Sequence, residues 1–458
     1  MARRPLFRIH LAAIMLGLLI VTLSAPANAQ TPRIQSQGAA AAGMGNAFAA
    51  QADDPSALHY NAAGMTQLSG VQMMLGTTLI GGTTDFTGPT GATTTGNRGG
   101  VIVIPPPSHF YLTANLKSLG LPSLDNVTIG IGANSPFGSQ SRYPEGSPLR
   151  FASTFTTLPL IDIKPTAAIK LNEQLSIGVG LDIYTFSSIF GHGQVELNSI
   201  SSGALGPLAP AGSKIEINGS DTAVGANVSL LYTPLRNEEG KPVLNFGFVY
   251  RSETALDLNG EFLVNGTKRA NASTKFILPE IMSAAVAYWP VRARDREWKL
   301  EFDVDRANWA SVNDFNIALS NGVTIPNPQK WTPSYTYMFG TEYKWLSPES
   351  LRDWDIALRA GYMHQESQVP AQTFLPGIPS ARSHTPSVGL GLLCKENGTL
   401  FGLRCGSLGP VKAIGLDLTY QAVLYEDRVV AGHLTNATIN GTYSTTVQVG
   451  SISLRFNF

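Results

Sequence analysis

The chain ends in the stretch Ser451-Ile452-Ser453-Leu454-Arg455-Phe456-Asn457-Phe458. Its apolar residues recur at every second position, up to an aromatic residue at the very end. A period of two puts alternate side chains on opposite faces of an extended strand. This segment therefore predicts a β-strand with one apolar face and one polar face.

The same alternation recurs through most of the chain. In Val243-Leu244-Asn245-Phe246-Gly247-Phe248-Val249-Tyr250-Arg251, aromatic and aliphatic residues share one face, and Asn245, Gly247 and Arg251 share the other. About fourteen such segments are present, an even number as bacterial single-chain barrels require. The predicted strands are 70–80, 101–115, 124–133, 158–171, 175–188, 221–233, 242–256, 276–289, 296–309, 332–345, 353–365, 384–394, 411–427 and 444–458.

The beginning of the chain has the features of a secretory signal peptide. Arg3, Arg4 and Arg8 precede an apolar run, and Ala27-Asn28-Ala29 fits the small-x-small cleavage pattern. We expect cleavage after Ala29. The rest of the sequence has no apolar run long enough for a membrane helix, and only helices and closed barrels satisfy backbone polar groups in lipid.

Composition narrows the class of protein further. The formal net charge is +0 and only 14% of residues are charged, against about 25% in an average soluble domain. With its charges balanced, the chain has no net positive charge that would attract nucleic acid. A secreted β-sandwich would also alternate, but the polar faces here are rich in Gly and Ser, as suits a crowded lumen. The alternation up to Phe458 is similar to the closing-strand signal read by the barrel-assembly machinery, so we expect an all-β outer-membrane barrel.

The connections between the predicted strands alternate in length. Residues 171–175 and 234–241 are short, as periplasmic turns are, whereas the predicted outer loops are long: 134–157, 189–220, 257–275, 310–331 and 366–383. Cys394 and Cys405 fall on the periplasmic side, where a disulfide is able to form. Residues 30–69 precede the first strand and are rich in Ala, Gly and Asn, which suggests a plug inside the barrel or a disordered leader.

Residues 30–69 are also where a family resemblance becomes specific. The segments Gly43-Met44-Gly45-Asn46-Ala47-Phe48, Ala52-Asp53-Asp54-Pro55-Ser56-Ala57 and Tyr60-Asn61-Ala62-Ala63-Gly64-Met65 resemble the N-terminal hatch of the FadL long-chain fatty acid transporter family. Asn61, Ala62, Ala63 and Gly64 stand where that family usually carries Asn-Pro-Ala-Gly. Further short matches follow in the family's order: Ser135-Pro136-Phe137-Gly138, residues 163–168 and 175–180, Leu278-Pro279, Asn308-Trp309-Ala310, residues 358–362 and residues 375–379.

The resemblance implies a fourteen-stranded barrel made by residues 70–458 and plugged by a hatch at 30–69. It implies passive uptake of long-chain fatty acids or, in some branches, of aromatic hydrocarbons such as toluene. No cofactor or metal is expected, and the family suggests a monomer in the outer membrane. Which hydrophobic substrate is carried stays open.

The family's route suggests where ligand binds. It begins at a groove between outer loops, for which the candidates are Leu205, Leu208, Ile215, Phe262, Leu263 and Val264. It continues to a lumen pocket against the hatch, for which the candidates are Met44, Phe48, Leu58, Tyr60 and Met65. The alternative for both sets is ordinary packing of loops and plug.

A carboxylate ligand would need a cation in the lumen. Lys164, Arg251 and Arg359 face the lumen by strand parity, but Asp162, Asp355 and Asp417 are placed to neutralise them. If those charges satisfy one another, a neutral hydrocarbon fits as well as an acid. The family releases ligand sideways at a kink in its third strand, where Gly130 and Gly132 lie here.

Three other functions are known for proteins that alternate in this way or form outer-membrane barrels. An outer-membrane hydrolase needs a nucleophile, a base and an orienting group, but the seven His are scattered and no Gly-x-Ser-x-Gly motif occurs, so no catalytic residue is assigned. A general water-filled porin would need no apolar hatch. An adhesin or structural barrel is the third alternative.

Overall fold

The computed structural model describes residues 32–188, 193–400, 403–407 and 409–458. The predicted signal peptide, residues 1–29, lies outside the described residues. Among those residues, no helix is both long enough and apolar enough to cross a membrane.

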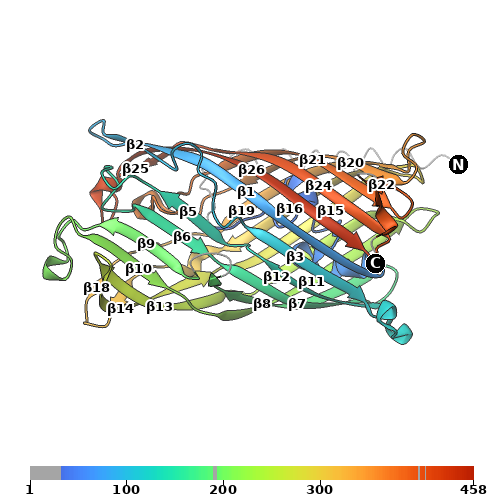
Figure 1. Cartoon of the computed structure of the whole chain (residues 1–458), viewed down its shortest axis with the longest axis horizontal. Helices are drawn as coiled ribbons and strands as arrows, with labels where there is room; N and C mark the ends of the chain where they lie inside the picture. Colours follow the sequence, from blue (N-terminus) through green and yellow to red (C-terminus); the bar gives the residue numbers. More distant parts are fainter. Residues whose placement is uncertain (1–31, 189–192, 401–402, 408) are drawn as a thin grey trace.

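Fourteen antiparallel strands form a closed barrel (Figure 1). Closure comes from the last strand, which pairs with the first from Gln72 opposite Asn457 to Thr87 opposite Thr442. This confirms the predicted fold class, and each predicted strand has its counterpart in order. The barrel strands are β1 Val71–Thr87, β3 Ser108–Asn115, β4 Val127–Asn134, β7 Ile161–Lys170, β8 Leu175–Thr185, β11 Ala223–Arg236, β12 Pro242–Arg251, β15 Glu280–Arg292, β16 Arg296–Asn308, β19 Ser334–Leu346, β20 Trp354–Gln365, β21 Ser383–Lys395, β24 Ala413–Tyr425 and β26 Gly441–Asn457.

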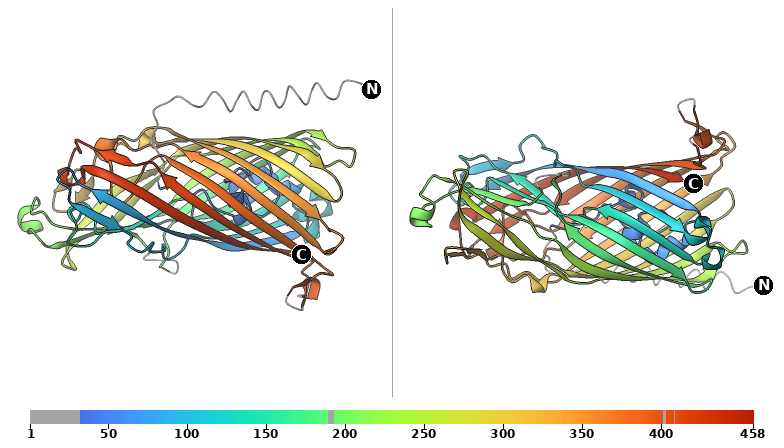
Figure 2. Two further views of the ribbon diagram at one scale, coloured as in Figure 1. Left: turned by 90° about the horizontal axis from the view of Figure 1, so that it is seen from above. Right: turned by 60° about the horizontal axis from the view of Figure 1, so that its bottom comes forward.

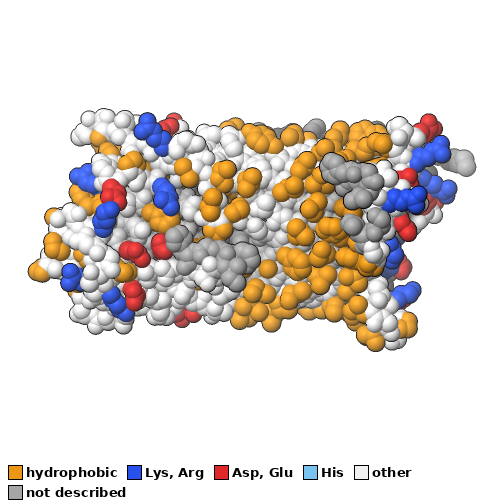
Figure 3. Space-filling view, viewed as in Figure 1, with side chains coloured by type: hydrophobic (Ala, Val, Ile, Leu, Met, Phe, Trp, Pro, Cys, Tyr) orange, Lys and Arg blue, Asp and Glu red, His pale blue; other side chains and the backbone are white. Residues whose placement is uncertain are grey.

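The two faces of these strands differ as the alternation predicts. Exposed apolar residues point outward, and charged residues with little exposure point into the lumen, so that on β12 Phe246 and Phe248 are exposed whereas Asn245 and Arg251 are buried. In Figure 3, charged side chains gather at the two ends of the molecule and hydrophobic ones cover much of the surface between them. This arrangement gives the barrel a lipid-facing surface.

The predicted long outer loops are more ordered than expected. Four of them carry strands that join in a second, eight-stranded sheet beyond the barrel strands. Its members are β5 Gly138–Arg142, β6 Phe155–Pro159, β9 Val195–Ile200, β10 Lys214–Gly219, β13 Thr254–Val264, β14 Thr267–Leu278, β17 Ile317–Leu319 and β18 Thr324–Ile325. Three smaller pieces, β2 Thr93–Gly96, β25 Arg428–Val430 and the pair β22 Thr399–Leu400 with β23 Leu403–Arg404, complete the strands.

One predicted strand is shorter than expected. The sequence predicts a strand over 101–115, but β3 begins at Ser108. Pro105, Pro106 and Pro107 have no N–H to donate to a strand ladder, so pairing stops there. Residues 101–107 instead run as an irregular segment, which we call the wall strap.

Residues 32–69, the described part of the predicted hatch, lie inside the barrel, where the blue segment of Figure 2 is enclosed by the strands. We call them the hatch. The hatch contains three short helices, α2 Ala39–Gly43, α3 Ala57–Tyr60 and η1 Ala62–Gln67. The other short helices lie between strands and are η2 Leu116–Leu119, η3 Pro122–Leu124, η5 Gly206–Leu208, η6 Trp309–Ser311, η7 Ala371–Thr373, η8 Cys405–Ser407 and η9 Ala437–Ile439.

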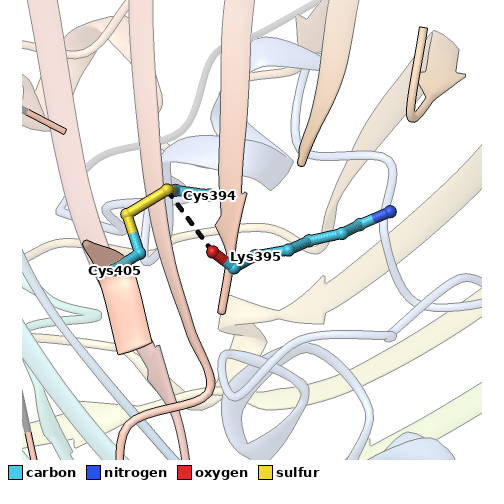
Figure 4. Close-up of a disulfide and its surroundings, with 3 residues drawn as sticks. All are labelled: Cys394, Lys395 and Cys405. Carbon is cyan, nitrogen blue, oxygen red and sulfur yellow. Dashed lines mark hydrogen bonds between the residues drawn. A yellow bond between two sulfur atoms is a disulfide. The ribbon is translucent and has the colours of Figure 1, made fainter. Parts of the chain in front are cut away.

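A disulfide joins Cys394, near the end of β21, to Cys405 (Figure 4). Both cysteines are buried. The bond ties the connection between β21 and β24 to the end of the barrel at which β1 begins and β26 ends.

The assignment of the lipid-facing surface can be tested with two arginine variants. Leu418 on β24 lies between Leu390 and Ile452 of its neighbouring strands and is exposed. We expect Leu418→Arg to reduce the free energy of unfolding by about 2–4 kcal/mol, because it places a charge in hydrocarbon. Denaturant unfolding from lipid vesicles measures the change. Leu434→Arg, at an exposed leucine after β25, is the control and should leave stability unchanged; equal effects of the two variants would contradict the assigned surface.

Candidate functional site

The hatch is held in the lumen by carboxylates of one strand, β16. Asp303 Oδ2 accepts hydrogen bonds from the backbone N–H groups of Phe48 and Ala49, both at 2.9 Å. Glu301 Oε1 accepts from Ala50 and Gln51 at 2.7 and 3.0 Å. Hydrogen bonds to a charged acceptor are among the stronger ones in proteins. Two side chains therefore satisfy four successive buried donors of an irregular segment.

A third carboxylate of β16 holds the start of the hatch. Asp305 forms a buried ion pair with Arg33, with 2.7 Å between Oδ2 and Nη2. Beside it, Ile34 donates its backbone N–H to the carbonyl of Pro136 at 2.8 Å. The hatch is thus fixed to the barrel at two separate points along its length.

The predicted hatch motif forms a local cap. The Asn61 side chain donates to the carbonyls of Ala49 and Leu230 and accepts from the N–H of Ala63, which caps η1. Ala62 is the first residue of η1, a position where proline is well tolerated because its missing N–H has no intrahelical partner. The family's usual proline and the alanine here therefore suit the same backbone.

Glycines of the wall allow the hatch to approach closely. A Cβ built on Gly361 of β20 would lie 2.1 Å from the carbonyl carbon of Met44, and one on Gly340 of β19 would lie 2.5 Å from the Met44 oxygen. No side chain fits at either position while the hatch stays in place. Part of the high glycine content of the lumen face thus has a steric cause.

The three cations predicted for carboxylate recognition are all paired. Lys164 contacts Asp162 and Asp182, and Arg251 also pairs with Asp182. Arg359 holds Glu342 and Asp417, each at 2.6 Å. Asp162 and Asp417 neutralise lumen cations as the sequence suggested.

Asp355 takes a different partner from the one the sequence suggested. Its carboxylate pairs with Lys395 at 2.7 Å, near the end of β21. Glu342 and Asp182 supply the charges that were expected from Asp355.

A cavity of about 440 Å³ lies between the start of the hatch and the barrel wall. Residues 33–36 of the hatch form one side, and the other sides come from β1, the wall strap, the end of β4 and parts of β5, β6, β24 and β26. Much of its lining is apolar and includes Ile34, Ile80, Phe137, Leu158, Leu160 and Val423. Its volume falls within the usual range of small-molecule sites, roughly 300–1,000 Å³.

The wall strap closes the cavity toward the outside and is held unequally on its two sides. Toward β1, Val103 donates its backbone N–H to Ile80, Pro107 accepts from Thr78, and Ile102 bridges Gly81. Toward β5, the strap forms two hydrogen bonds within the described part of the chain. Both join the Gln140 side chain to the backbone of Ile104. Ile104 is 68% exposed on the outer surface.

The predicted lumen residues fall into two packed clusters. Met44 and Phe48 cluster with Tyr60, and Leu58 and Met65 cluster with wall residues such as Tyr111. None of these five is among the residues that line the cavity. In this arrangement they fasten the hatch, and their role as ligand contacts stays a prediction.

The predicted groove residues are partly brought together. Leu205, Leu208 and Ile215 pack against a cluster that contains Phe262 and Val264 in the second sheet. Leu263 lies on the adjoining position of β13, opposite Glu216. The structure thus joins the two predicted loops at the outer end, on strands β10 and β13.

At Gly130 and Gly132, β4 pairs with β3 and β7 without interruption. A Cβ at Gly130 would meet Leu58 at 2.6 Å, and one at Gly132 would meet Tyr111 at 2.7 Å. A lateral opening at these two glycines stays a prediction.

Comparisons with known proteins match this architecture. A model of the family described as outer membrane protein transport protein (OMPP1/FadL/TodX) matches residues 18–400. The chain belongs to this family. The protein is therefore an outer-membrane transporter of hydrophobic compounds, which agrees with its barrel, hatch and apolar cavity.

Individual relatives are distant. A long-chain fatty acid transport protein of Escherichia coli O6:H1 is 22% identical over 404 residues, which cover 78% of this chain and 82% of the relative. The crystal structure of a Pseudomonas aeruginosa FadL homologue has a TM-score of 0.70 at 17% identity and covers 94% of this chain and 100% of that one. That of the Pseudomonas putida toluene transporter TodX has a TM-score of 0.63 at 17% identity, with 92% and 98% covered.

Sequence reasoning missed most of the cavity lining. Arg33 to Ser36 precede the recognisable hatch motifs, and the sequence predicts the wall strap as part of a strand. The run Pro105-Pro106-Pro107 was the available signal for the strap. Ser135-Pro136-Phe137-Gly138 resembles a family motif, and Ser135, Phe137 and Gly138 line the cavity.

The close approach at Gly361 gives a test of hatch seating. We expect Gly361→Val to displace the hatch, because the new side chain would overlap the backbone of Met44 and Gly45. Single-channel recording in planar bilayers should then show a raised steady conductance. Gly450→Val is the matched control, since a Cβ on this β26 glycine meets nothing within 4 Å. An unchanged conductance in Gly361→Val, with a folded barrel, would show that the hatch is not seated there.

Proposed function

We propose that this protein lets small hydrophobic molecules cross the outer membrane passively, binding them in the cavity between hatch and wall. The observation that supports this most directly is that apolar cavity, which touches the hatch on one side and the outer wall on the other. A molecule bound there is withdrawn from water at about 25 cal/mol per Å² of apolar surface. The hatch meanwhile fills the lumen, which argues against a general porin.

Long-chain fatty acids are the first candidate substrates, in line with the E. coli relative's name. Aromatic hydrocarbons are the second, in line with the toluene transporter that shares the fold. The paired state of Lys164, Arg251 and Arg359 favours neutral molecules, because no charge in that group is left for a carboxylate. The protein passes these molecules on unchanged, and passive transport needs neither a cofactor nor a metal.

The remaining parts of the proposal concern the chain as a whole. Residues 1–29 act as a signal, 30–69 as the hatch and 70–458 as the barrel of a monomer. Phe458 presents the closing strand to the barrel-assembly machinery. The cluster around Phe262 and Leu205 is the first contact for ligand from outside.

Besides the lateral opening predicted at Gly130 and Gly132, we propose a second candidate exit at the seam between the wall strap and β5. Two hydrogen bonds of one side chain, Gln140, close this seam beside the cavity. The strap's outer surface carries Val101, Ile102 and Ile104 exposed toward lipid. A ligand that moves past Gln140 would therefore meet an apolar surface all the way into the membrane.

Uptake of labelled oleate tests the function. We expect cells that lack their own fatty acid transporter to take up oleate when this protein is present in the outer membrane, above vector control. Labelled toluene, run in parallel, separates the two candidate substrates. If neither label enters although the barrel is folded and inserted, the proposed transport is wrong.

A tether tests the exit seam. In a chain with both native cysteines changed to alanine, we expect Ile104→Cys with Gln140→Cys, joined through disulfides by a short bis-methanethiosulfonate crosslinker, to lose uptake. Gly81→Cys with Ile102→Cys joins the strap to β1, to which it is already bonded, and should leave uptake intact. Reduction should restore the first variant. Normal uptake with the β5 side tethered would exclude this exit.

A further inference from the structure

Three polar atoms in the lining of the cavity have no hydrogen-bond partner among the described residues. They are Nη1 of Arg33, Nε2 of Gln35 and Oδ1 of Asn134. The Arg33 side chain is 9% exposed, and the residues Gln35 and Asn134 are 7% and 1% exposed. Buried polar atoms are nearly always paired, so three exceptions around one cavity need a physical explanation.

The three residues are held in place by the atoms around them. Arg33 bridges Phe137, and Gln37 exchanges hydrogen bonds with the backbone of Ser135, which follows Asn134 directly. This fixes the first residues of the hatch against the chain that leaves β4. The donors and the acceptor thus come from two segments that are bonded to each other beside the cavity.

The charge in this region is already balanced. Arg33 uses Nη2 to bind Asp305, and its unpaired Nη1 offers a donor without a spare positive charge. An ionised carboxylate in the cavity would therefore add an uncompensated charge to a buried site, which is costly. An uncharged group avoids this penalty.

We infer that Arg33, Gln35 and Asn134 form a subsite for the head group of an amphiphile that carries one uncharged O–H. Its oxygen accepts from Arg33 Nη1 or Gln35 Nε2, and its hydrogen is donated to Asn134 Oδ1. The apolar body lies along Ile80, Leu158 and Val423. An alcohol and an un-ionised carboxylic acid share this chemistry, and a bare hydrocarbon lacks it. The inference rests on the proposed function and names its preferred ligand class.

The three atoms are covered by their neighbours in this structure, so small side-chain rotations must present them to a ligand. The rotations of Arg33 and Asn134 are limited, because Arg33 Nη2 must keep its contact with Asp305 and Asn134 Nδ2 its bond with His59 Nδ1. A site that binds a hydroxyl group in this way discriminates strongly against an analogue that lacks it, because the buried polar atoms then stay unpaired.

Binding of three matched probes tests the subsite. The compounds 4-butylbenzyl alcohol, 4-butyltoluene and 4-butylbenzoate share one body and differ in a single head group. Each is labelled, and its retention by the full protein in nanodiscs is corrected for retention by empty nanodiscs. We expect the alcohol to bind about tenfold more tightly than the hydrocarbon, and the benzoate to bind more weakly than the alcohol at neutral pH.

Variants assign the effect to residues. We expect Gln35→Met and Asn134→Leu each to weaken binding of the alcohol about fivefold and to leave the hydrocarbon unchanged. Arg33→Met combined with Asp305→Asn removes both charges of the ion pair together. This double variant should also weaken binding of the alcohol and leave binding of the hydrocarbon unchanged. Gln72→Met, at a buried glutamine of β1 outside the cavity lining, is the control and should bind all three probes as the wild type does. Only variants whose barrels are closed, as shown by heat-modifiable mobility, are compared.

The possible failures are distinct. Equal binding of alcohol and hydrocarbon, or variants that keep the wild-type preference, would overturn the subsite and leave the proposed function standing. Tightest binding of the benzoate would overturn the uncharged head group. Retention of none of the three by the wild type would overturn the subsite, and it would overturn the proposed function as well if neither oleate nor toluene is taken up.

Discussion

An irregular segment inside a barrel must find partners for its own backbone. Many N–H groups of the hatch bond within it, but those of residues 48–51 do not, and each one left unpaired and buried would cost about 1–3 kcal/mol. Asp303 and Glu301 accept four of these groups at the turn that begins with Phe48. The polar face of β16 therefore fixes residues 48–51 of the hatch, while polar side chains of other strands, such as Ser387 and Ser453, hold further parts of it. The position of the hatch decides where space is left for a ligand.

This constraint explains why the lumen is so rich in charge and yet offers little to an anion. Carboxylates are needed to hold backbone donors, and buried carboxylates need cations nearby, as Lys299 is to Glu301 at 2.6 Å. Each cation that neutralises a structural carboxylate is lost to ligand recognition, as with Arg359 between Glu342 and Asp417. What remains for ligand is an apolar cavity at the edge of the hatch, away from these networks.

The sequence predicted the barrel well because its signal is local. Alternation in one strand needs no knowledge of its neighbours, and β20 or β24 could be placed within a residue or two. The second sheet was missed because its strands pair across long loops, such as β6 with β9. The cavity was missed for the same reason: Arg33, Ile80 and Asn134 are far apart in sequence, and only the closed barrel brings them together. Charge pairing was foreseen for Asp162 and Asp417, but parity alone could not choose between Asp355 and Glu342.

The exit that we propose lies where the wall strap interrupts the regular pairing of the barrel strands. Separating two ordinary strands breaks a continuous ladder, such as the eleven residue pairs between β19 and β20. Three consecutive prolines prevent a ladder here, so the strap meets β5 through the two bonds of Gln140 alone in the described chain. At about 0.5–1.5 kcal/mol net for each hydrogen bond, parting this seam is within reach of the binding energy of a small ligand. During the proposed opening of the seam, the many residue pairs between β1 and β26 would keep the rest of the barrel closed.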